Sequence, residues 1–208
     1  MSVYVIGGGG HAKVVVATLQ AAGTPVAGVL DDDPTRHGQA VLGVPVLGPV
    51  ALAREVAGPV VIAVGDNAAR RRIADALDGA VAWATAVHPH ACVHPSVRLG
   101  EGTVVFAGVV VQPDAALGRH AIVNTSASVD HDCRLGDFVH IAPGVRLAGS
   151  VRLGEGVFLG VGSSVLPGRE VGAWTTVGGG GVVVYDLPAH VVAVGVPARP
   201  RTVGRTEG

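Results

Sequence analysis

The chain has 208 residues, 15 Lys and Arg against 16 Asp and Glu, and only two cysteines, Cys92 and Cys133. This composition excludes a disulfide framework and argues against a nucleic-acid or membrane surface, and no apolar run reaches the roughly 18 residues of a membrane span. Glycine contributes 32 residues and aromatic side chains only 3%, so the core must be narrow and filled by small aliphatic groups. We expect a soluble protein of the reducing cytoplasm.

The first 80 residues alternate between strand and helix patterns. Strands are expected at Val3–Ile6, Val26–Leu30 and Val60–Val64, with a short extended piece at Leu42–Leu47. Helices are expected over His11–Ala22 and from an N-cap at Asp66 or Asn67 to about Leu77. This alternation predicts a small parallel α/β domain, half of a Rossmann fold, over residues 1–80.

A glycine cluster, Gly7–Gly10, follows the first strand and opens the first helix in the pattern G-x-G-x-x-A. Backbone N–H groups at such a helix N-terminus can hold a phosphate. Asp31 and Asp32 end the second strand, where a carboxylate could bind a ribose hydroxyl. Because the domain is only half of a dinucleotide-binding fold, we expect a single nucleotide diphosphate rather than NAD. A tight turn without a ligand is the alternative.

From Val87 to Val183 an aliphatic residue returns every six positions without interruption, 17 times in all. The residue four places after each one is mostly small or β-branched. A sustained six-residue period is typical of a parallel β-helix. Three hexads close one triangular coil, so residues 81–208 are expected to form between five and six coils and a C-terminal tail, with each aliphatic residue pointing into the prism.

These features resemble the hexapeptide-repeat sugar O-/N-acyltransferases of sialic-acid and bacillosamine pathways, which are left-handed β-helix acetyltransferases. The resemblance rests on the hexads and on the segments GGGGHAKVV, LDDDP and VIAVGDNAARRRIA. It implies a homotrimer, acetyl-CoA as cosubstrate and a nucleotide-linked sugar held by the N-terminal domain. With the glycine turn, the positions that match the family pattern give the predicted substrate-binding residues: Gly7, Gly8, Gly9, Gly10, His11, Asp31, Asp32, Gly65, Asn67 and Asn124.

His131 is the predicted general base. It lies two places after the inward Val129 and therefore points outward. Acyl transfer to an amine or hydroxyl needs a base, and histidine has a suitable pKa near neutral pH. Asp130 or Asp132 could orient the imidazole. The resembled family has a histidine followed by an acidic residue here, which makes His131 and Asp132 the predicted catalytic pair; a solvated polar surface is the alternative.

His140 follows His131 by nine residues, which is half of an 18-residue coil. The two side chains should lie on roughly opposite sides of one prism, so they can share a site only if a second subunit of a trimer contributes one of them. The resemblance implies that His140 contacts the thioester end of acetyl-CoA. It also implies further cofactor-binding positions at Gly149, Gly179, Pro197 and Arg199. A surface histidine without a partner and a plain proline-ended turn are the alternatives.

A group of possible metal ligands, His88, His90, Cys92 and His94, opens the hexad region. His88 and His94 hold equivalent positions on consecutive faces and should diverge, whereas a tetrahedral zinc site needs convergent ligands. We therefore expect no metal site. Cys133 falls in a small inward position and is expected to pack in the core.

The predicted function is acetyl-CoA-dependent N-acetylation of a nucleotide-linked amino sugar, a UDP- or GDP-amino-dideoxy sugar. O-acetylation of a sialic acid or another sugar is the alternative within the enzyme class. A non-catalytic or metal-using β-helix is a more distant one. The nucleotide-like N-terminal domain favours the first, because a free sugar needs no phosphate cradle.

Overall fold

The computed structural model describes residues 2–201, and its N-terminal part is a five-stranded sheet flanked by two helices. The strand order is β3-β4-β2-β1-β5, and every pair is parallel except β3 with β4. The elements are β1 Val3–Ile6, α1 Gly10–Ala21, β2 Val26–Leu30, β3 Ala40–Val41, β4 Val44–Gly48, β5 Val60–Ile62 and α2 Asn67–Leu77, with 3-10 turns at Pro34–Arg36 and Val50–Arg54. The parallel α/β prediction is confirmed.

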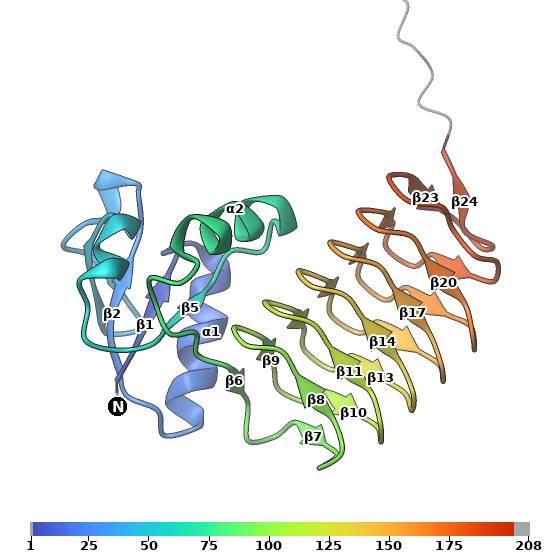
Figure 1. The fold of residues 1–208 in the computed structure, drawn as a ribbon, viewed down its shortest axis with the longest axis horizontal. Helices are drawn as coiled ribbons and strands as arrows, with labels where there is room; N and C mark the ends of the chain where they lie inside the picture. Colours follow the sequence, from blue (N-terminus) through green and yellow to red (C-terminus); the bar gives the residue numbers. More distant parts are fainter. Residues whose placement is uncertain (1, 202–208) are drawn as a thin grey trace, which may run out of the picture.

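From β6 onward the chain winds into a left-handed parallel β-helix with three sheets as its faces (Figure 1). Face I contains β6 Ala86–Val87, β9 Val104–Val105, β12 Ile122–Val123, β15 His140–Ile141, β18 Phe158–Leu159, β21 Thr176–Val177, β23 Val192–Val194 and β24 Arg199–Pro200. Face II contains β7 Cys92–Val93, β10 Val110–Val111, β13 Ser128–Val129, β16 Arg146–Leu147, β19 Ser164–Val165 and β22 Val182–Val183. Face III contains β8 Arg98–Leu99, β11 Ala116–Leu117, β14 Arg134–Leu135, β17 Arg152–Leu153 and β20 Glu170–Val171.

The hexad register is confirmed in detail. From β6 to β22 each two-residue strand ends on the periodic aliphatic residue, and strands 18 residues apart pair in parallel, as Val123 does with Ile141. The inward column is almost completely buried from Val105 to Val183. Small residues four places later, such as Ala121 and Cys133, are also fully buried. The prism core therefore consists of stacked aliphatic layers with small residues between them.

Every corner of the prism from residue 102 to residue 180 has a left-handed backbone conformation three places after the inward aliphatic residue. Glycine supplies many of these corners, but seven are not glycine: Asp114, His120, Ser126, Asp132, Phe138, Ser150 and Trp174. Asp and His tolerate this conformation better than bulky side chains do. Phe138 and Trp174, with φ of 58° each, are therefore unusual at such corners.

The last coil departs from the hexad period. Ala193 pairs with Val177 across an interval of 16 residues, and Leu187 bridges to Val171 across the same interval. Both Leu187 and Ala193 are buried at inward positions. The β-helix thus continues past the last regular hexad by a coil that is two residues shorter.

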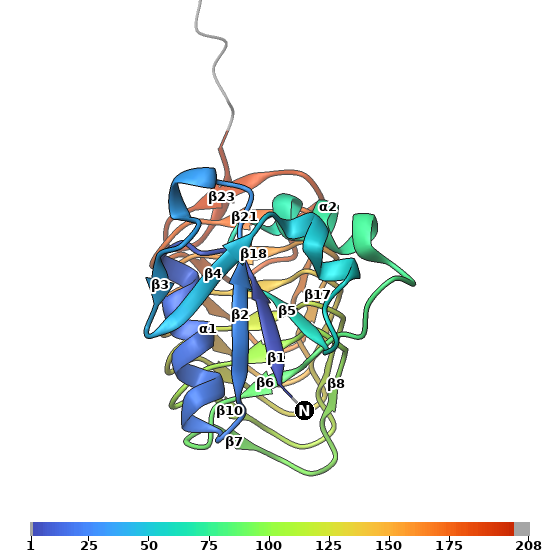
Figure 2. The same ribbon diagram turned by 90° about the vertical axis from the view of Figure 1, so that its left-hand side faces the viewer.

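The α/β part lies against the early and middle coils of face I, and the C-terminal coils extend beyond it (Figures 1 and 2). Helix α1 packs on this face, where Val15, Val16, Val104, Phe106 and Ile122 share one apolar cluster. Phe138 joins a second cluster with Ile6, Leu30 and Leu77 of the α/β part. These contacts bring the carboxyl ends of the small sheet next to the β-helix. None of the helices within residues 2–201 has the length and apolar character needed to cross a bilayer.

Candidate active site

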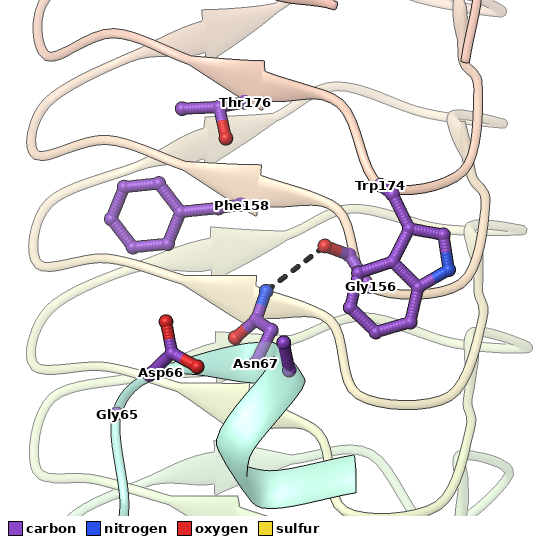
Figure 3. Close-up of a pocket in the computed structure, with 8 residues that line it drawn as sticks. Gly65, Asp66, Asn67, Gly156, Phe158, Trp174 and Thr176 are labelled. Atoms are coloured by element: carbon purple, nitrogen blue, oxygen red, sulfur yellow. Dashed lines mark hydrogen bonds between the residues drawn. The ribbon is translucent and has the colours of Figure 1, made fainter. Parts of the chain in front are cut away.

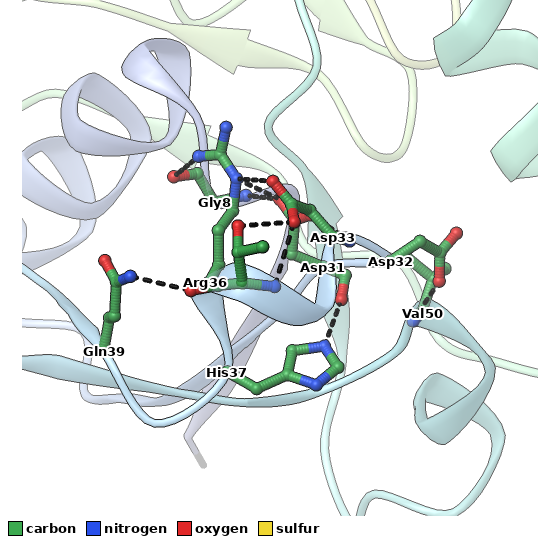
Figure 4. A network of polar contacts seen from close by, with 9 residues as sticks. Gly8, Asp31, Asp32, Asp33, Arg36, His37, Gln39 and Val50 are labelled. Carbon is green, nitrogen blue, oxygen red and sulfur yellow. Dashed lines mark hydrogen bonds and ion pairs between the residues drawn. The ribbon is translucent and has the colours of Figure 1, made fainter.

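The glycine turn is locked by Asp31 (Figure 4). The Gly8 N–H donates to Asp31 Oδ2 at 2.5 Å, and the Asp33 N–H donates to Asp31 Oδ1 at 2.8 Å. Arg36 Nη1 donates to the Gly8 carbonyl at 2.6 Å, and its Nε pairs with Asp33 Oδ2 at 3.1 Å. Asp31 therefore shapes the predicted phosphate-binding turn, a structural role in addition to the predicted substrate contact. Sequence reasoning missed Arg36, which follows Asp32 by four residues.

His11 and His140 meet where the α/β part contacts the β-helix. Their ring centroids are 6.1 Å apart, and His11 also packs edge-on against Phe106 at 5.4 Å. Burial, helped by the charge of the nearby Arg70 guanidinium, lowers the pKa of each imidazole to about 4. Both rings are therefore neutral at pH 7.

Hydrogen bonds fix the orientation of His140. Its Nδ1 lies 3.0 Å from the Gly65 carbonyl, which can only accept, so Nδ1 carries the proton in the neutral ring. Nε2 is then the acceptor of the ring, and it lies 3.4 Å from Asn124 Nδ2, which can donate to it. The predicted residues His11, Gly65, Asn124 and His140 thus lie together, and His140, assigned to the cofactor, stands among residues assigned to the sugar nucleotide.

Arg70 is a site residue that sequence reasoning missed. It is 1% exposed and bonds to five acceptors from both parts of the chain. The acceptors are the carbonyls of His120 at 2.8 Å, Val64 at 3.0 Å, Gly65 at 3.3 Å and Phe138 at 2.7 Å, and Asn67 Oδ1 at 2.8 Å. Burial lowers its pKa to about 9. The sequence analysis used the segment VIAVGDNAARRRIA only as a family motif. Which of its three arginines is buried depends on how α2 packs against the β-helix, so the sequence alone did not single out Arg70.

A pocket of about 360 Å³ opens beside this group, between the N-terminal end of α2 and face I (Figure 3). Its lining residues are Gly65, Asp66, Asn67, Ala68, Gly156, Phe158, Trp174 and Thr176. Asn67 Nδ2 donates to the Gly156 carbonyl at 3.0 Å, which joins the two walls. The Arg71 guanidinium lies 5.6 Å from the Trp174 ring centroid. Gly65 and Asn67 were predicted, whereas Phe158 and Trp174 were not, because the hexad pattern reports inward positions only.

His131 lies elsewhere in the same chain, at the vertex between faces II and III in the turn from β13 to β14. Its Nδ1 is 2.8 Å from Asp132 Oδ2, and both side chains are more than half exposed. The hydrogen bond that His131 Nδ1–H donates to Asp132 raises the pKa of the imidazole, and the negative charges of Asp130 and Asp132 add to this. Asp132, rather than Asp130, is therefore the carboxylate that orients the ring.

Gly149 occupies the equivalent corner one coil after His131. A Cβ on Gly149 would lie 2.5 Å from His131 Nε2, so only glycine leaves room for this ring position. Nε2 therefore faces the Gly149 backbone. Since this vertex is opposite face I, one chain keeps His131 apart from the group around His140, as the nine-residue spacing predicted.

The remaining predicted positions lie on the last coils and the first coil. The backbone of Gly179 runs beside the Val161 carbonyl, and the Arg199 guanidinium lies 4.5 Å from the Tyr185 ring centroid. Pro197 follows a cis peptide bond. In the first coil, His94 Nδ1 bonds to Ser96 Oγ at 3.0 Å. Within residues 2–201, no three His, Cys, Asp or Glu side chains are grouped so that they could hold a metal ion.

The chain combines a β-helix of hexads, an α/β unit on one face and a His–Asp pair at the opposite vertex. This combination defines a hexapeptide-repeat transferase. The family described as the PglD N-terminal domain matches residues 2–77. The perosamine N-acetyltransferase PerB of Caulobacter crescentus, solved with CoA and GDP-perosamine, is 49% identical with a TM-score of 0.91, covering 97% of this chain and 98% of that chain. The chain belongs to the hexapeptide-repeat sugar acyltransferases, which confirms the resemblance.

Two further relatives agree with this assignment. The acetyltransferase domain of PglB from Neisseria gonorrhoeae, in complex with acetyl coenzyme A, is 39% identical with a TM-score of 0.90 and covers 96% of this chain and 98% of that chain. The UDP-N-acetylbacillosamine N-acetyltransferase of Bacillus subtilis is 39% identical over 111 residues, 51% of each protein. This chain covers 21% of an uncharacterized protein of Acanthamoeba polyphaga mimivirus, at 34% identity over 104 residues.

Proposed function

We propose that this protein transfers an acetyl group from acetyl-CoA to the amine of a nucleotide-linked amino sugar. The observation that carries the proposal is the match along nearly the whole chain to an enzyme solved with CoA and GDP-perosamine. The His–Asp pair at the vertex supplies the base that such a transfer needs. We place the reaction in the cytoplasm, in keeping with two free cysteines, Cys92 and Cys133.

The two parts of the chain divide the substrates in this proposal. Residues 1–80 bind the sugar nucleotide, with the diphosphate on the turn Gly7–Gly10 at the start of α1. The group around His140 and Asn124 borders the sugar end. Residues 81–208 form the acetyltransferase domain, and acetyl-CoA lies along its coils past Gly149 and Gly179 toward Pro197 and Arg199. The glycines that keep these corners free of side chains support this assignment.

His131 acts as the general base. Asp132 holds the Nδ1 proton, which leaves the Nε2 lone pair free to accept a proton. As the sugar amine attacks the thioester carbonyl, the new N–C bond forms, the amine proton moves to Nε2 and the C–S bond breaks. The proton then leaves with the CoA thiol. Nε2 faces the Gly149 corner, so the reacting carbon would lie next to that backbone.

The proposed active site forms between subunits of a homotrimer. His131 at one vertex and the residues around His140 on face I cannot meet within one chain, because the prism separates them. A neighbouring subunit that brings its vertex to this face would complete the site. Closed rings of identical subunits are a common way to build such heterologous interfaces.

The test is a screen of UDP- and GDP-linked amino sugars with acetyl-CoA, read as the release of free thiol. The proposal predicts thiol release with at least one of them, and a product that survives mild alkali, because an amide resists it whereas an ester is hydrolysed. An alkali-labile product would support O-acetylation instead. No release with any amino sugar, while the protein remains folded, would contradict the proposal.

A further inference from the structure

We propose that Cys133 is a positioning residue for acetyl transfer: its buried thiol holds the Ala148–Gly149 peptide so that the Gly149 N–H points at the thioester carbonyl oxygen of acetyl-CoA. Cys133 itself touches no substrate. The inference rests on the proposed function, because it concerns the same reaction. It also predicts a property of bound acetyl-CoA in the absence of any sugar, so it can be tested separately.

The thiol of Cys133 binds the backbone of the next coil. Cys133 has no exposed surface, and its Sγ donates to the Ala148 carbonyl at 3.2 Å. Burial raises the pKa of this thiol, so it keeps the donated proton at pH 7. No backbone N–H within residues 2–201 donates to the Ala148 carbonyl, whereas the corresponding carbonyl of Leu166 accepts from the Arg169 N–H at 3.3 Å. Cys133 therefore supplies the bond that the backbone supplies one coil later.

The planar peptide carries this orientation on to Gly149. The carbonyl oxygen and the N–H of a trans peptide point in opposite directions. Since the Ala148 carbonyl accepts from a thiol inside the prism, the Gly149 N–H points out of the prism. Three of the corresponding corners carry proline, which has no N–H: Pro95, Pro113 and Pro167. The coil itself therefore does not need an N–H at this position.

The Gly149 N–H has no acceptor among the described residues, although Gly149 is buried. Buried N–H groups without a partner are rare and call for an explanation. This one lies beside the general base, because a Cβ on Gly149 would be 2.5 Å from His131 Nε2. When an amine that gives its proton to Nε2 attacks the thioester, the carbonyl oxygen of the acetyl group would be within reach of this N–H.

A donor at this position stabilises the charge that develops during the transfer. As the sugar amine attacks, the N–C bond forms and the carbonyl oxygen gains negative charge. When the C–S bond breaks, this charge passes to the sulfur, which takes the proton from His131. Removing one such oxyanion donor from an enzyme lowers kcat by about 100-fold or more. Loss of the Cys133 thiol leaves the donor in place but free to turn, so kcat should fall less, and binding of acetyl-CoA should hardly change.

The first test compares Cys133→Ala, which removes the thiol donor, with Cys133→Ser, which keeps a donor. Both should fold, because Ala115 holds the equivalent buried position one coil earlier and Ser163 holds a buried inward position on face I. In Cys133→Ala, kcat should fall at least about fivefold while KM for acetyl-CoA changes less than about twofold. In Cys133→Ser, kcat should stay within about twofold of the wild type. Wild-type kcat in Cys133→Ala, or an equal loss in both variants, would overturn the proposal.

A matched variant separates positioning from packing. Val109 is a fully buried inward residue at a corner between faces I and II, away from His131. Val109→Ala removes more apolar volume than Cys133→Ala, so it should lower the melting temperature at least as much. Its kcat should equal that of the wild type. A loss of kcat in Val109→Ala as large as that in Cys133→Ala would show that Cys133 only fills the core.

The hydrogen bond to the acetyl group can also be observed directly. Acetyl-CoA with an isotopic label at the thioester carbonyl carbon is bound without sugar, and isotope-edited infrared spectroscopy records the carbonyl stretch. A hydrogen bond from the Gly149 N–H lowers this frequency. The band should therefore lie at higher frequency in Cys133→Ala than in the wild type and Cys133→Ser. Identical bands in all three would overturn the proposal and leave the proposed function intact, whereas failure of the wild type to bind acetyl-CoA would contradict both.

Discussion

At the scale of single residues, His131 carries the chemical step of the proposal. Replacing His131 with Ala should lower kcat by about two to four orders of magnitude, the usual cost of losing a general base. Binding of acetyl-CoA should stay nearly unchanged, since the imidazole serves proton transfer. Steady-state kinetics with calorimetry checks this, and a variant that keeps most of its activity would exclude His131 as the base.

Asp132 should affect the pH dependence of kcat/KM. Its hydrogen bond stabilises the protonated imidazole and thereby raises the pKa of His131. The wild type therefore needs a higher pH to present the neutral base. In Asp132→Asn the acidic limb of the kcat/KM profile should move to lower pH while the plateau also falls. If the acidic limb of the profile lies at the same pH in Asp132→Asn as in the wild type, a group other than His131 determines its position.

Gly149 is predicted to set the position of the His131 ring. In Gly149→Ala the new methyl group would lie 2.5 Å from Nε2, so the exposed imidazole must turn away. We expect kcat to fall at least about tenfold while the melting temperature changes little, because an exposed side chain can move at small cost. Full activity in this variant would show that His131 works from a different position.

At the scale of elements, the corners of the β-helix store backbone strain that can be measured. Gly162 has φ +66°, and a Cβ added at this position would meet no atom within 4 Å, so Gly162→Ala probes the left-handed conformation alone. It should cost about 1 kcal/mol of unfolding free energy. Ser150→Ala is the control, because Ser150 already holds φ 60° as an L residue. Equal effects of the two changes in denaturant titrations would refute this account.

The stacked layers should dominate stability. Leu147 is 2% exposed in the inward column of face II, whereas Leu166, just after β19, is 43% exposed. Leu147→Ala should destabilise by about 2–5 kcal/mol, but Leu166→Ala by less than about 1 kcal/mol. Chemical unfolding measures both, and a large loss in Leu166→Ala alone would contradict the assigned register.

Many of the secondary-structure elements were predictable, because they depend on local patterns in the sequence. The strands Val3–Ile6 and Val26–Leu30 match their predicted bounds. Every periodic aliphatic residue from Val87 to Val183 is the last residue of a strand. The short final coil was not predictable, since its 16-residue interval breaks the period. Phe138 and Trp174 at left-handed corners were also missed, because bulky residues carry no signal for that conformation.

At the scale of the whole molecule, Arg70 ties the two parts of the chain together. Lysine places its charge at one point and cannot reach five acceptors, so Arg70→Lys should destabilise the protein and raise KM for the sugar nucleotide by at least about fivefold. Arg152→Lys, on exposed face III, is the control and should behave like the wild type. Thermal melting and steady-state kinetics measure the two effects. A melting temperature and a KM in Arg70→Lys equal to those of the wild type would mean that the five hydrogen bonds are dispensable.

The contact that Arg70 makes between the two parts of the chain also explains why the site was only partly predictable. The family pattern assigned His11, Gly65 and Asn124 to the sugar nucleotide and His140 to the cofactor, and the structure brings all four close together. Their closeness, however, depends on how α2 docks on face I through Arg70. Such a contact between distant segments leaves no periodic trace in the sequence.

Buried histidines at this interface should make folding sensitive to acid. His120 is fully buried, stacks on Phe138 with centroids 5.3 Å apart, and has no hydrogen-bond partner for either ring nitrogen among the described residues. Burial lowers its pKa from 6.5 to about 4. The unfolded chain therefore binds more protons between pH 6.5 and 4, and stability is lost as the pH falls through this window.

His120→Phe should reduce that loss by up to about 1.4 kcal/mol per pH unit. Phenylalanine already occupies the equivalent corner one coil later, at Phe138 with φ 58°. Urea unfolding at several pH values provides the measurement. A slope equal to that of the wild type would show that His120 does not control the acid sensitivity.

The central claim, a site completed by His131 of a neighbouring subunit, is tested most directly by mixing two inactive variants. His131→Ala and His140→Ala chains are unfolded and refolded together, and thiol release from acetyl-CoA is measured with the nucleotide-linked amino sugar found in the screen. Random assembly into rings should restore about a quarter of the wild-type activity, because one in four interfaces then joins an intact His131 to an intact His140. A mixture that assembles but stays as inactive as each parent would contradict the shared site.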